Sequence, residues 1–239
     1  METSTNLPDC WQELQDCLNA GIDRVILFGP SGIGKTYAGL TMGNIEGGAY
    51  RLVCTEDMTN MEVTGAFMPD AGGKFSWVAG AALEAWEGNG ITGGRLVADE
   101  IDKASGDVSS TLLAMMDSPE SASWKHPETG RIHRPREGFS VIMTTNIEDM
   151  AELPTALSDR FPVRIRINAP HPKALERLSY DLRDYAVRMA DAGARRVSLR
   201  AFMAFDQLRK TLGADKAAKI IFRERAESVL DAIAVDATK

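Results

Sequence analysis

Three short runs of consecutive apolar residues stand out in the first two thirds of the chain, at 25–28, 96–98 and 141–143. Each run is continuous rather than alternating, which is typical of parallel strands covered on both faces. Each run is also followed by polar residues. Because ligands bind at the carboxyl ends of the strands in open α/β sheets, we expect these three ends to meet at one site.

Apolar residues recur at helical spacing before the first run, between the second and third, and throughout the last third of the chain. The positions are Cys10, Leu14, Cys17 and Leu18, then Val108, Leu112, Met115 and Met116, and finally Leu175, Leu178, Leu182, Tyr185, Met189, Phe202, Phe205, Leu208, Leu212, Ile220, Ile221, Val229, Leu230 and Ile233. The segment 163–167 instead alternates apolar residues with arginines, which indicates a fourth strand with one less buried face.

These patterns predict an α/β domain with a parallel sheet, followed by a small all-α domain of about three helices with turns at Gly193 and Gly213. We place an N-terminal helix and linker at 1–21, the α/β core at 22–169 and a helical lid at 170–239.

Composition narrows the class of protein. With 239 residues, 44% of them hydrophobic, the chain can bury a core, and disordered, collagen-like and coiled-coil classes are excluded. A net charge of −7 argues against a surface built to neutralise phosphates, so nucleic acid is not the favoured partner. The three cysteines and three histidines lack the spacing of a disulfide framework or a zinc site. Without a signal-peptide or membrane-span pattern, we expect a cytoplasmic location and no membrane partner.

The segment 29–36 matches the G-x-x-x-x-G-K-[ST] pattern between an apolar strand and a helix. Its glycines let successive backbone N–H groups turn toward a phosphate, and the helix N-terminus adds positive potential. The Lys of this pattern reaches the β- and γ-phosphates and its Thr binds Mg²⁺, so we predict ATP and Mg²⁺ as ligands. A glycine-rich turn that matches by chance is the less favoured interpretation. The predicted contacts are Gly29, Pro30, Ser31, Gly32, Ile33, Gly34, Lys35 and Thr36.

Adjacent acids, Asp99 and Glu100, close the second strand. One carboxylate can hold Mg²⁺ while the next deprotonates the attacking water, and we assign these tasks to Asp99 and Glu100 in that order. Asn146 ends the third strand and can donate to a γ-phosphate or hold that water, although taken alone it reads as a turn residue. The predicted metal ligands are therefore Thr36 and Asp99.

In order and spacing these segments resemble an AAA+ ATPase, with 29–36 similar to its Walker A motif, 96–102 to Walker B and 144–146 to sensor 1. The resemblance implies a P-loop NTPase three-layer sandwich with a helical lid. It also implies an arginine finger at Arg160 and a sensor 2 arginine in the lid at Arg200. Without the resemblance, both arginines read as solvated surface residues.

Other features refine the comparison. The usual Asn-Arg pair after the Walker B acids is Asp102-Lys103 here. Two segments resemble the MoxR-like, dynein-related branch, which includes CbbQ-type and chelatase ATPase subunits: 66–77 is similar to its hairpin inserted in helix 2, and 122–137 to its hairpin before sensor 1. The first presents the aromatics Phe67, Phe75 and Trp77 around a Gly-rich turn. We expect it to contact a partner rather than ATP, with packing on its own domain as the alternative.

The resemblance implies a Mg²⁺-dependent ATPase working as a homo-oligomer, a hexameric ring, that remodels or activates a protein client or adaptor in a chaperone-like way. A protein with a von Willebrand A domain is one such partner. Alternatives are the ATPase subunit of a cobalt or magnesium chelatase, a DNA-processing ATPase such as a loader, and a small-molecule P-loop kinase. Basic residues in 122–137 would suit DNA, but such runs are usually solvated faces. They are Lys125, Arg131, His133, Arg134 and Arg136.

Overall fold

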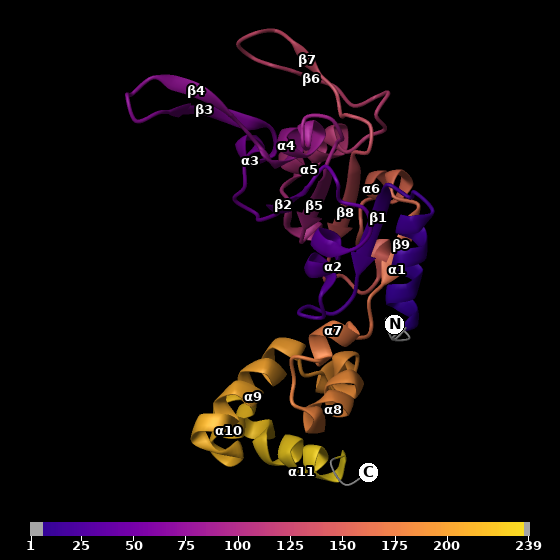
Figure 1. Ribbon diagram of the computed structural model, residues 1–239, viewed down its shortest axis with the longest axis vertical. Coiled ribbons are helices and arrows are strands. Elements are labelled where there is room, and N and C mark those ends of the chain that lie inside the picture. Colours follow the sequence, from indigo (N-terminus) through magenta and orange to yellow (C-terminus); the bar gives the residue numbers. More distant parts are fainter. Residues whose placement is uncertain (1–6, 237–239) are drawn as a thin grey trace. The chain divides into compact units, whose positions relative to one another are not determined.

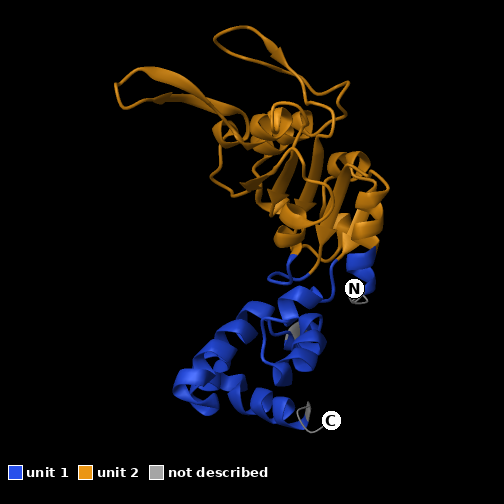
Figure 2. Ribbon diagram, viewed as in Figure 1, with its two compact units in different colours: residues 1–12, 30–34, 167–239 blue, residues 13–29, 35–166 orange. Residues whose placement is uncertain are grey.

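The computed structural model describes residues 7–236. Residues 1–6 of the predicted N-terminal segment and 237–239 of the predicted lid lie outside the described residues. The chain divides into two compact units (Figure 2). We call them the sheet unit (13–29 and 35–166) and the helical unit (1–12, 30–34 and 167–239).

Five parallel strands form the central sheet, in the order β2-β5-β8-β1-β9 (Figure 1). The strands are β1 (Arg24–Phe28), β2 (Ala49–Val53), β5 (Arg95–Asp99), β8 (Ser140–Thr144) and β9 (Val163–Arg166). The helices before and between them are α1 (Asp9–Asn19), α2 (Lys35–Thr41), α3 (Asn60–Thr64), α4 (Ala81–Glu87), α5 (Gly106–Met115) and α6 (Thr155–Arg160), with 3-10 helices η1 (Ile101–Lys103) and η2 (Met150–Glu152).

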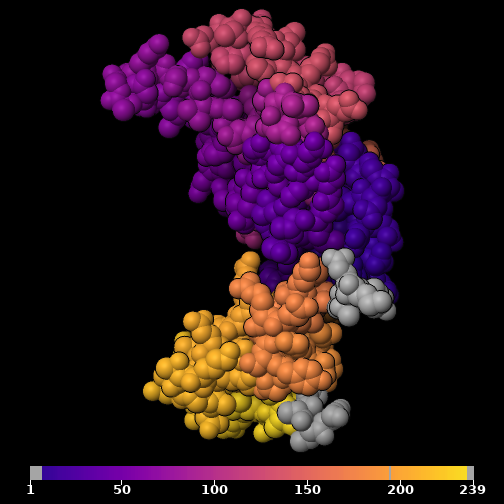
Figure 3. All heavy atoms as spheres, viewed as in Figure 1, coloured from indigo at the N-terminus to yellow at the C-terminus, as the bar shows by residue number. Residues whose placement is uncertain are grey.

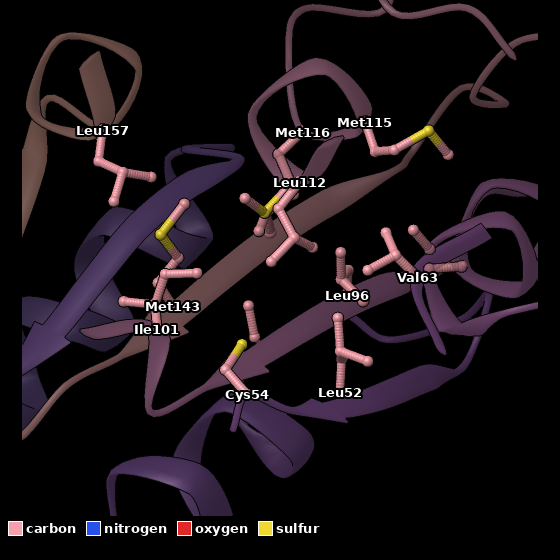
Figure 4. Close-up of a cluster of buried hydrophobic side chains, with 14 of the residues drawn as sticks. Leu52, Cys54, Val63, Leu96, Ile101, Leu112, Met115, Met116, Met143 and Leu157 are labelled. Carbon is pink, nitrogen blue, oxygen red and sulfur yellow. The ribbon is translucent and has the colours of Figure 1, made fainter. Parts of the chain in front are cut away.

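Helices cover both faces of this sheet. On one face, α2 approaches so closely that a Cβ built on Gly39 would lie 3.0 Å from Val97 Cγ1, which explains a glycine inside this helix. On the other face, Leu52 and Leu96 of the sheet belong to the same buried cluster as Leu112 of α5 (Figure 4). The predicted α/β class with a parallel sheet is therefore confirmed.

The sheet contains one strand that the apolar pattern does not predict. β2 lies at the edge of the sheet and, among residues 7–236, pairs only with β5, in register from Ala49 with Arg95 to Val53 with Asp99. Among its residues only Leu52 is buried, so β2 lacks the continuous apolar run of a central strand.

Two of the central strands have a buried arginine as their first residue, and each arginine donates hydrogen bonds to the end of a neighbouring helix. Arg95 is 3% exposed, and its guanidinium donates to the carbonyls of Gly39 and Met42 at the end of α2. Arg24 donates in the same way to the carbonyl of Met116 after α5, at 2.9 Å. These bonds satisfy helix C-terminal carbonyls and fix the helices on the sheet.

Two antiparallel hairpins extend from the sheet unit on the same side (Figure 1). The first consists of β3 (Gly65–Pro69) and β4 (Phe75–Ala79), and the second of β6 (Trp124–Lys125) and β7 (Ile132–His133). The two hairpins are in contact near their bases, where the ring centroids of Trp77 and Trp124 are 5.3 Å apart, and they neighbour one another on the surface (Figure 3).

The helical unit has its own core around Phe202 and Phe205. Its helices are α7 (Pro172–Leu175), α8 (Tyr180–Ala190), η3 (Gly193–Arg195), α9 (Leu199–Leu212), α10 (Ala214–Phe222), η4 (Arg223–Arg225) and α11 (Ala226–Asp236). Within 167–236 this makes five α-helices rather than about three. The apolar spacing merges α10 with α11, whereas the chain turns between them at Arg223, whose φ is +53°.

Candidate functional site

The loop between β1 and α2 contains the Gly-rich motif. Gly29, Gly32 and Gly34 have φ values of +118°, +71° and +116°, which residues with a Cβ adopt only under strain. The motif therefore needs glycine at these places, and the loop leads directly into the first turn of α2. A turn of this kind presents backbone N–H groups toward an anion at the helix N-terminus.

Lys35 is the first residue of α2, and its side chain extends back to Gly29, the residue that follows β1. Its side chain is buried, and its Nζ donates to the Gly29 carbonyl at 2.8 Å and to Asn146 Oδ1 at 3.0 Å. Both of these acceptors are uncharged oxygens, and a lysine ammonium at this place suits an anion that binds at the loop.

Asp99 ends β5 and is only 4% exposed. Its Oδ1 accepts hydrogen bonds from Thr36 Oγ1 at 2.7 Å and Thr144 Oγ1 at 2.5 Å, and its Oδ2 accepts from Arg51 Nε at 3.1 Å and Nη2 at 2.5 Å. Burial alone would raise the pKa of this carboxyl. The hydrogen bonds from Thr144, Thr36 and Arg51 outweigh that effect and lower its pKa, so Asp99 is ionised.

Glu100 follows in the left-handed conformation, at φ 58° and ψ 48°. Such strain in a residue with a Cβ is characteristic of functional sites. Its backbone N–H donates to Thr144 Oγ1 at 3.2 Å, its Oε1 accepts from Asn146 Nδ2 at 3.2 Å, and its Oε2 pairs with Lys103 Nζ. The side chain is one third exposed, so solvent reaches this carboxylate.

Asn146 stands between the loop and the acids. One side of its amide accepts from Lys35 and the other donates to Glu100. The carboxyl ends of β1, β5 and β8, which pair in parallel, thus bring five of the sequence-predicted residues together. They are Lys35, Thr36, Asp99, Glu100 and Asn146.

The sequence interpretation misses Arg51 and Thr144 as members of the site. Thr144 ends β8, and its Oγ1 donates a hydrogen bond to Asp99. Its place two residues before Asn146, a predicted site residue, is the signal in the sequence that could have found it. Arg51 comes from the unpredicted edge strand, and only pairing of β2 with β5 reveals its contact. Asp102 is held by Thr145, whose Oγ1 donates to its carboxylate at 2.6 Å.

Arg160 lies away from this site. Its Nη2 is 3.4 Å from Asp117 Oδ2, and the Asp117 carbonyl accepts a hydrogen bond from Arg24, the first residue of β1. Lys35 follows the opposite end of β1, and a five-residue strand spans about 16 Å. The guanidinium of Arg160 is therefore at the amino edge of the sheet, at the other end from the loop.

Arg200 lies in the first turn of α9 in the helical unit and is exposed. The same unit contains residues 30–34 of the loop, and a Cβ built on Gly32 would lie 3.8 Å from Cγ and Cδ of Arg200. Ser198 caps this helix by accepting from the Ala201 N–H.

The sequence from 24 to 161 matches the family model described as AAA domain (dynein-related subfamily). This match covers more than half of the chain. The chain belongs to the dynein-related AAA family. Its fold, sheet order and Gly-rich loop agree with an AAA-type ATPase domain that binds nucleotide. No match to a curated protein was found.

Solved structures resemble this AAA protein at low identity. NtrX from Brucella abortus is 16% identical over 87% of this chain and 53% of its own, with a TM-score of 0.53, which shows the shared fold. A candidate ATPase from Cytophaga hutchinsonii is 18% identical over 93% of this chain and 66% of its own, with a TM-score of 0.47. The chain thus spans less than two thirds of each. No helix in 7–236 combines the length and apolarity needed to cross a membrane.

Proposed function

We propose that this AAA protein is a Mg²⁺-dependent ATPase of the MoxR-like branch, similar to CbbQ-type and chelatase ATPase subunits, that works in a ring and remodels a protein partner. One observation carries the proposal of ATP hydrolysis. The Asn146 amide joins Lys35, which begins α2 behind the Gly-rich loop, to Glu100, the carboxylate suited to activate water. This arrangement supports phosphate recognition by Lys35 next to proton acceptance by Glu100.

The chemical groups at the loop and at the end of β5 are suited to bind phosphate and a metal ion. The loop N–H groups and Lys35 receive the phosphate oxygens, which is electrostatic stabilisation with little covalent demand on the protein. The oxygens of Thr36 and Asp99, 2.7 Å apart, fit a hard cation such as Mg²⁺. A Mg²⁺ ion held by Thr36 and Asp99 would supply positive charge that offsets the charge of the phosphates.

The remaining residues act on the water. Glu100 is the general base that accepts a proton from the attacking water at a carboxylate oxygen. Asn146 holds Oε1 of Glu100 and orients the group toward the γ-phosphate. Arg200, beside loop residue Gly32 in the helical unit, is proposed as sensor 2.

A ring is proposed from the place of Arg160. Because this arginine is about one strand length from the loop of its own chain, it can stabilise a γ-phosphate only in a neighbouring subunit. We propose a homo-oligomer, with the hexamer of related motors as the expected form.

The two hairpins support a protein client. The three aromatic side chains of the first hairpin differ in exposure. Trp77 packs against its own domain, whereas Phe67 and Phe75 are 39% and 63% exposed. Exposed aromatics on a projecting hairpin suit contact with a polypeptide. A client or adaptor, such as a protein with a von Willebrand A domain, is the proposed partner.

The same hairpins weigh against DNA. Arg136 pairs with Glu87, and Arg134 donates to the carbonyls of Glu120 and Ala122, so both guanidinium groups serve the base of the hairpin. A chelatase role would instead appear as stimulation by a metal-inserting partner. We propose a reducing cytoplasm, where the free thiols of Cys10, Cys17 and Cys54 would stay reduced.

The test compares Glu100→Gln with Lys35→Ala in ATP titration and phosphate release. Glu100→Gln should bind ATP normally and lose at least about 10²-fold in hydrolysis, because binding survives without the base. Lys35→Ala should lose ATP binding itself. The exposed Glu84→Gln on α4 is the matched control. Normal turnover by Glu100→Gln would contradict the assignment. With hydrolysis lost as expected, ATP-bound Glu100→Gln can serve to capture the client.

A further inference from the structure

Arg51 is an unexpected partner of the carboxylate proposed to serve the metal. In the register of β2 and β5, Arg51 pairs with Val97, so its side chain lies on the same sheet face as Asp99, two residues further along β5. A long side chain reaches such a diagonal neighbour, and the Arg51 guanidinium donates two N–H groups to Asp99 Oδ2.

With these bonds, Asp99 accepts about as many hydrogen bonds as a carboxylate can. An ionised carboxylate accepts about four hydrogen bonds. Thr36 and Thr144 use two positions on Oδ1, and Arg51 uses two on Oδ2. The Thr36 hydroxyl can keep its bond to Asp99 while its oxygen faces Mg²⁺. A water bound to Mg²⁺ can donate to Asp99 only after Arg51 releases a position.

We propose that Arg51 is a positioning residue that competes with Mg²⁺ for Asp99. It keeps a buried carboxylate paired when nucleotide and metal are absent, which avoids the cost of an uncompensated buried charge. Its side chain is 48% exposed while that of Asp99 is 5% exposed, so the arginine is the partner with room to swing into solvent. The inference rests on the proposed function, because it requires a metal-nucleotide complex at Asp99.

The test measures binding of ATP to the full chain by calorimetry over a series of free Mg²⁺ concentrations, starting in EDTA. Arg51→Gln should lower the half-saturating Mg²⁺ concentration by about five- to tenfold, since metal loading no longer breaks charge-assisted bonds. Arg51→Lys keeps the charge but offers one ammonium, so the shift should be about two- to threefold. In EDTA the Tm of Arg51→Gln should fall, and Mg²⁺ with ATP should raise it by more than in the wild type.

The control is Arg136→Gln, which removes a cation and an ion pair of the same unit on the second hairpin. It should leave the Mg²⁺ dependence unchanged. An unchanged or higher half-saturating Mg²⁺ concentration in Arg51→Gln, or an equal shift in Arg136→Gln, would overturn the proposal. If Arg51→Gln does not fold, the Mg²⁺ series on Arg51→Lys decides. Failure of the wild type to bind ATP at any Mg²⁺ concentration would instead refute the proposed function, and this inference with it.

Discussion

Lys103 donates to Glu100 Oε2 from the end of the short helix η1, so a basic side chain neutralises the carboxylate that we propose as general base. Lys103 stands where the sequence departs from the usual Asn-Arg pair of AAA+ proteins. The ion pair raises the pKa of Lys103, first through the hydrogen bond to Glu100 and then through its charge. Lys103 is therefore positively charged throughout the neutral range.

We expect Lys103→Met to increase turnover, because it frees Oε2 of Glu100 to accept a hydrogen bond from water. The side chains of Lys103 and Glu100 are 47% and 33% exposed, so solvent screens the pair and the increase should not exceed about fivefold in kcat at saturating ATP. Steady-state phosphate release measures it, with Lys125→Met on the second hairpin as the control. A loss of turnover would mean that Lys103 orients Glu100 productively.

Arg160 should act in trans. Arg160→Ala should reduce ATP hydrolysis by about 10³- to 10⁵-fold with little effect on ATP affinity, because an arginine finger stabilises the transition state. Mixing Arg160→Ala with Lys35→Ala subunits should restore part of the activity, since some sites then combine an intact Lys35 with an intact Arg160.

The control for this experiment is Arg164→Ala, which removes a nearby arginine whose guanidinium donates to the Ser158 carbonyl at 2.8 Å. Its mixture with Lys35→Ala should show only additive activity. Absence of recovery in rings proven to contain both Arg160→Ala and Lys35→Ala subunits would exclude action in trans.

The first hairpin should couple the ATPase to its client. Its turn is held by Asp70, whose Oδ1 accepts from the N–H groups of Gly72 and Lys74 at 2.8 and 2.9 Å. Deleting residues of the 70–73 turn together with Phe67→Ser should abolish client-dependent stimulation and leave assembly and basal ATPase largely intact.

A matched control is Ile91→Ser, which removes an apolar side chain that is 85% exposed outside both hairpins. It should leave stimulation unchanged. The ring centroids of Phe67 and Trp77 are 5.2 Å apart in an edge-to-face pair. If the hairpin variant loses basal turnover or fails to fold, this pair stabilises the domain and does not contact a client.

Asp206 should stabilise the helical unit in a pH-dependent way. It is 3% exposed and accepts from the N–H and Oγ of Ser179, at 3.0 Å each, and from Arg209 Nε at 2.9 Å. Burial opposes ionisation, but the bonds from Ser179 and Arg209 prevail, so the pKa of Asp206 is lowered. Asp206→Asn should reduce the free energy of unfolding by about 1–3 kcal/mol at pH 7.

Because the folded-state pKa lies below the unfolded value near 3.8, this stabilisation is complete above about pH 4 and is lost as pH falls through the folded pKa. Denaturant unfolding of wild type and Asp206→Asn from pH 7 to pH 2 measures the difference, which should shrink only below about pH 4. The exposed Asp215→Asn is the control. A difference that is constant with pH would show that packing, not charge, is responsible.

Much of the α/β fold, and the choice of 29–36, Asp99 and Glu100 as candidate site residues, follow from local rules. A continuous apolar run such as 25–28 is typical of a strand that is covered on both faces. The segment 29–36 indicates a phosphate loop, because three of its backbone positions need glycine. Asp99 and Glu100 are recognisable because they end such a strand.

Only the tertiary structure decided which distant side chains meet. Asn146 alone reads as a turn residue, and it becomes informative when parallel pairing brings β8 beside β5 and its amide between Lys35 and Glu100. Arg51 reads as a surface charge until the edge strand β2 is seen. A side chain's partner depends on strand order, and strand order is a property of the whole packed sheet rather than of any segment.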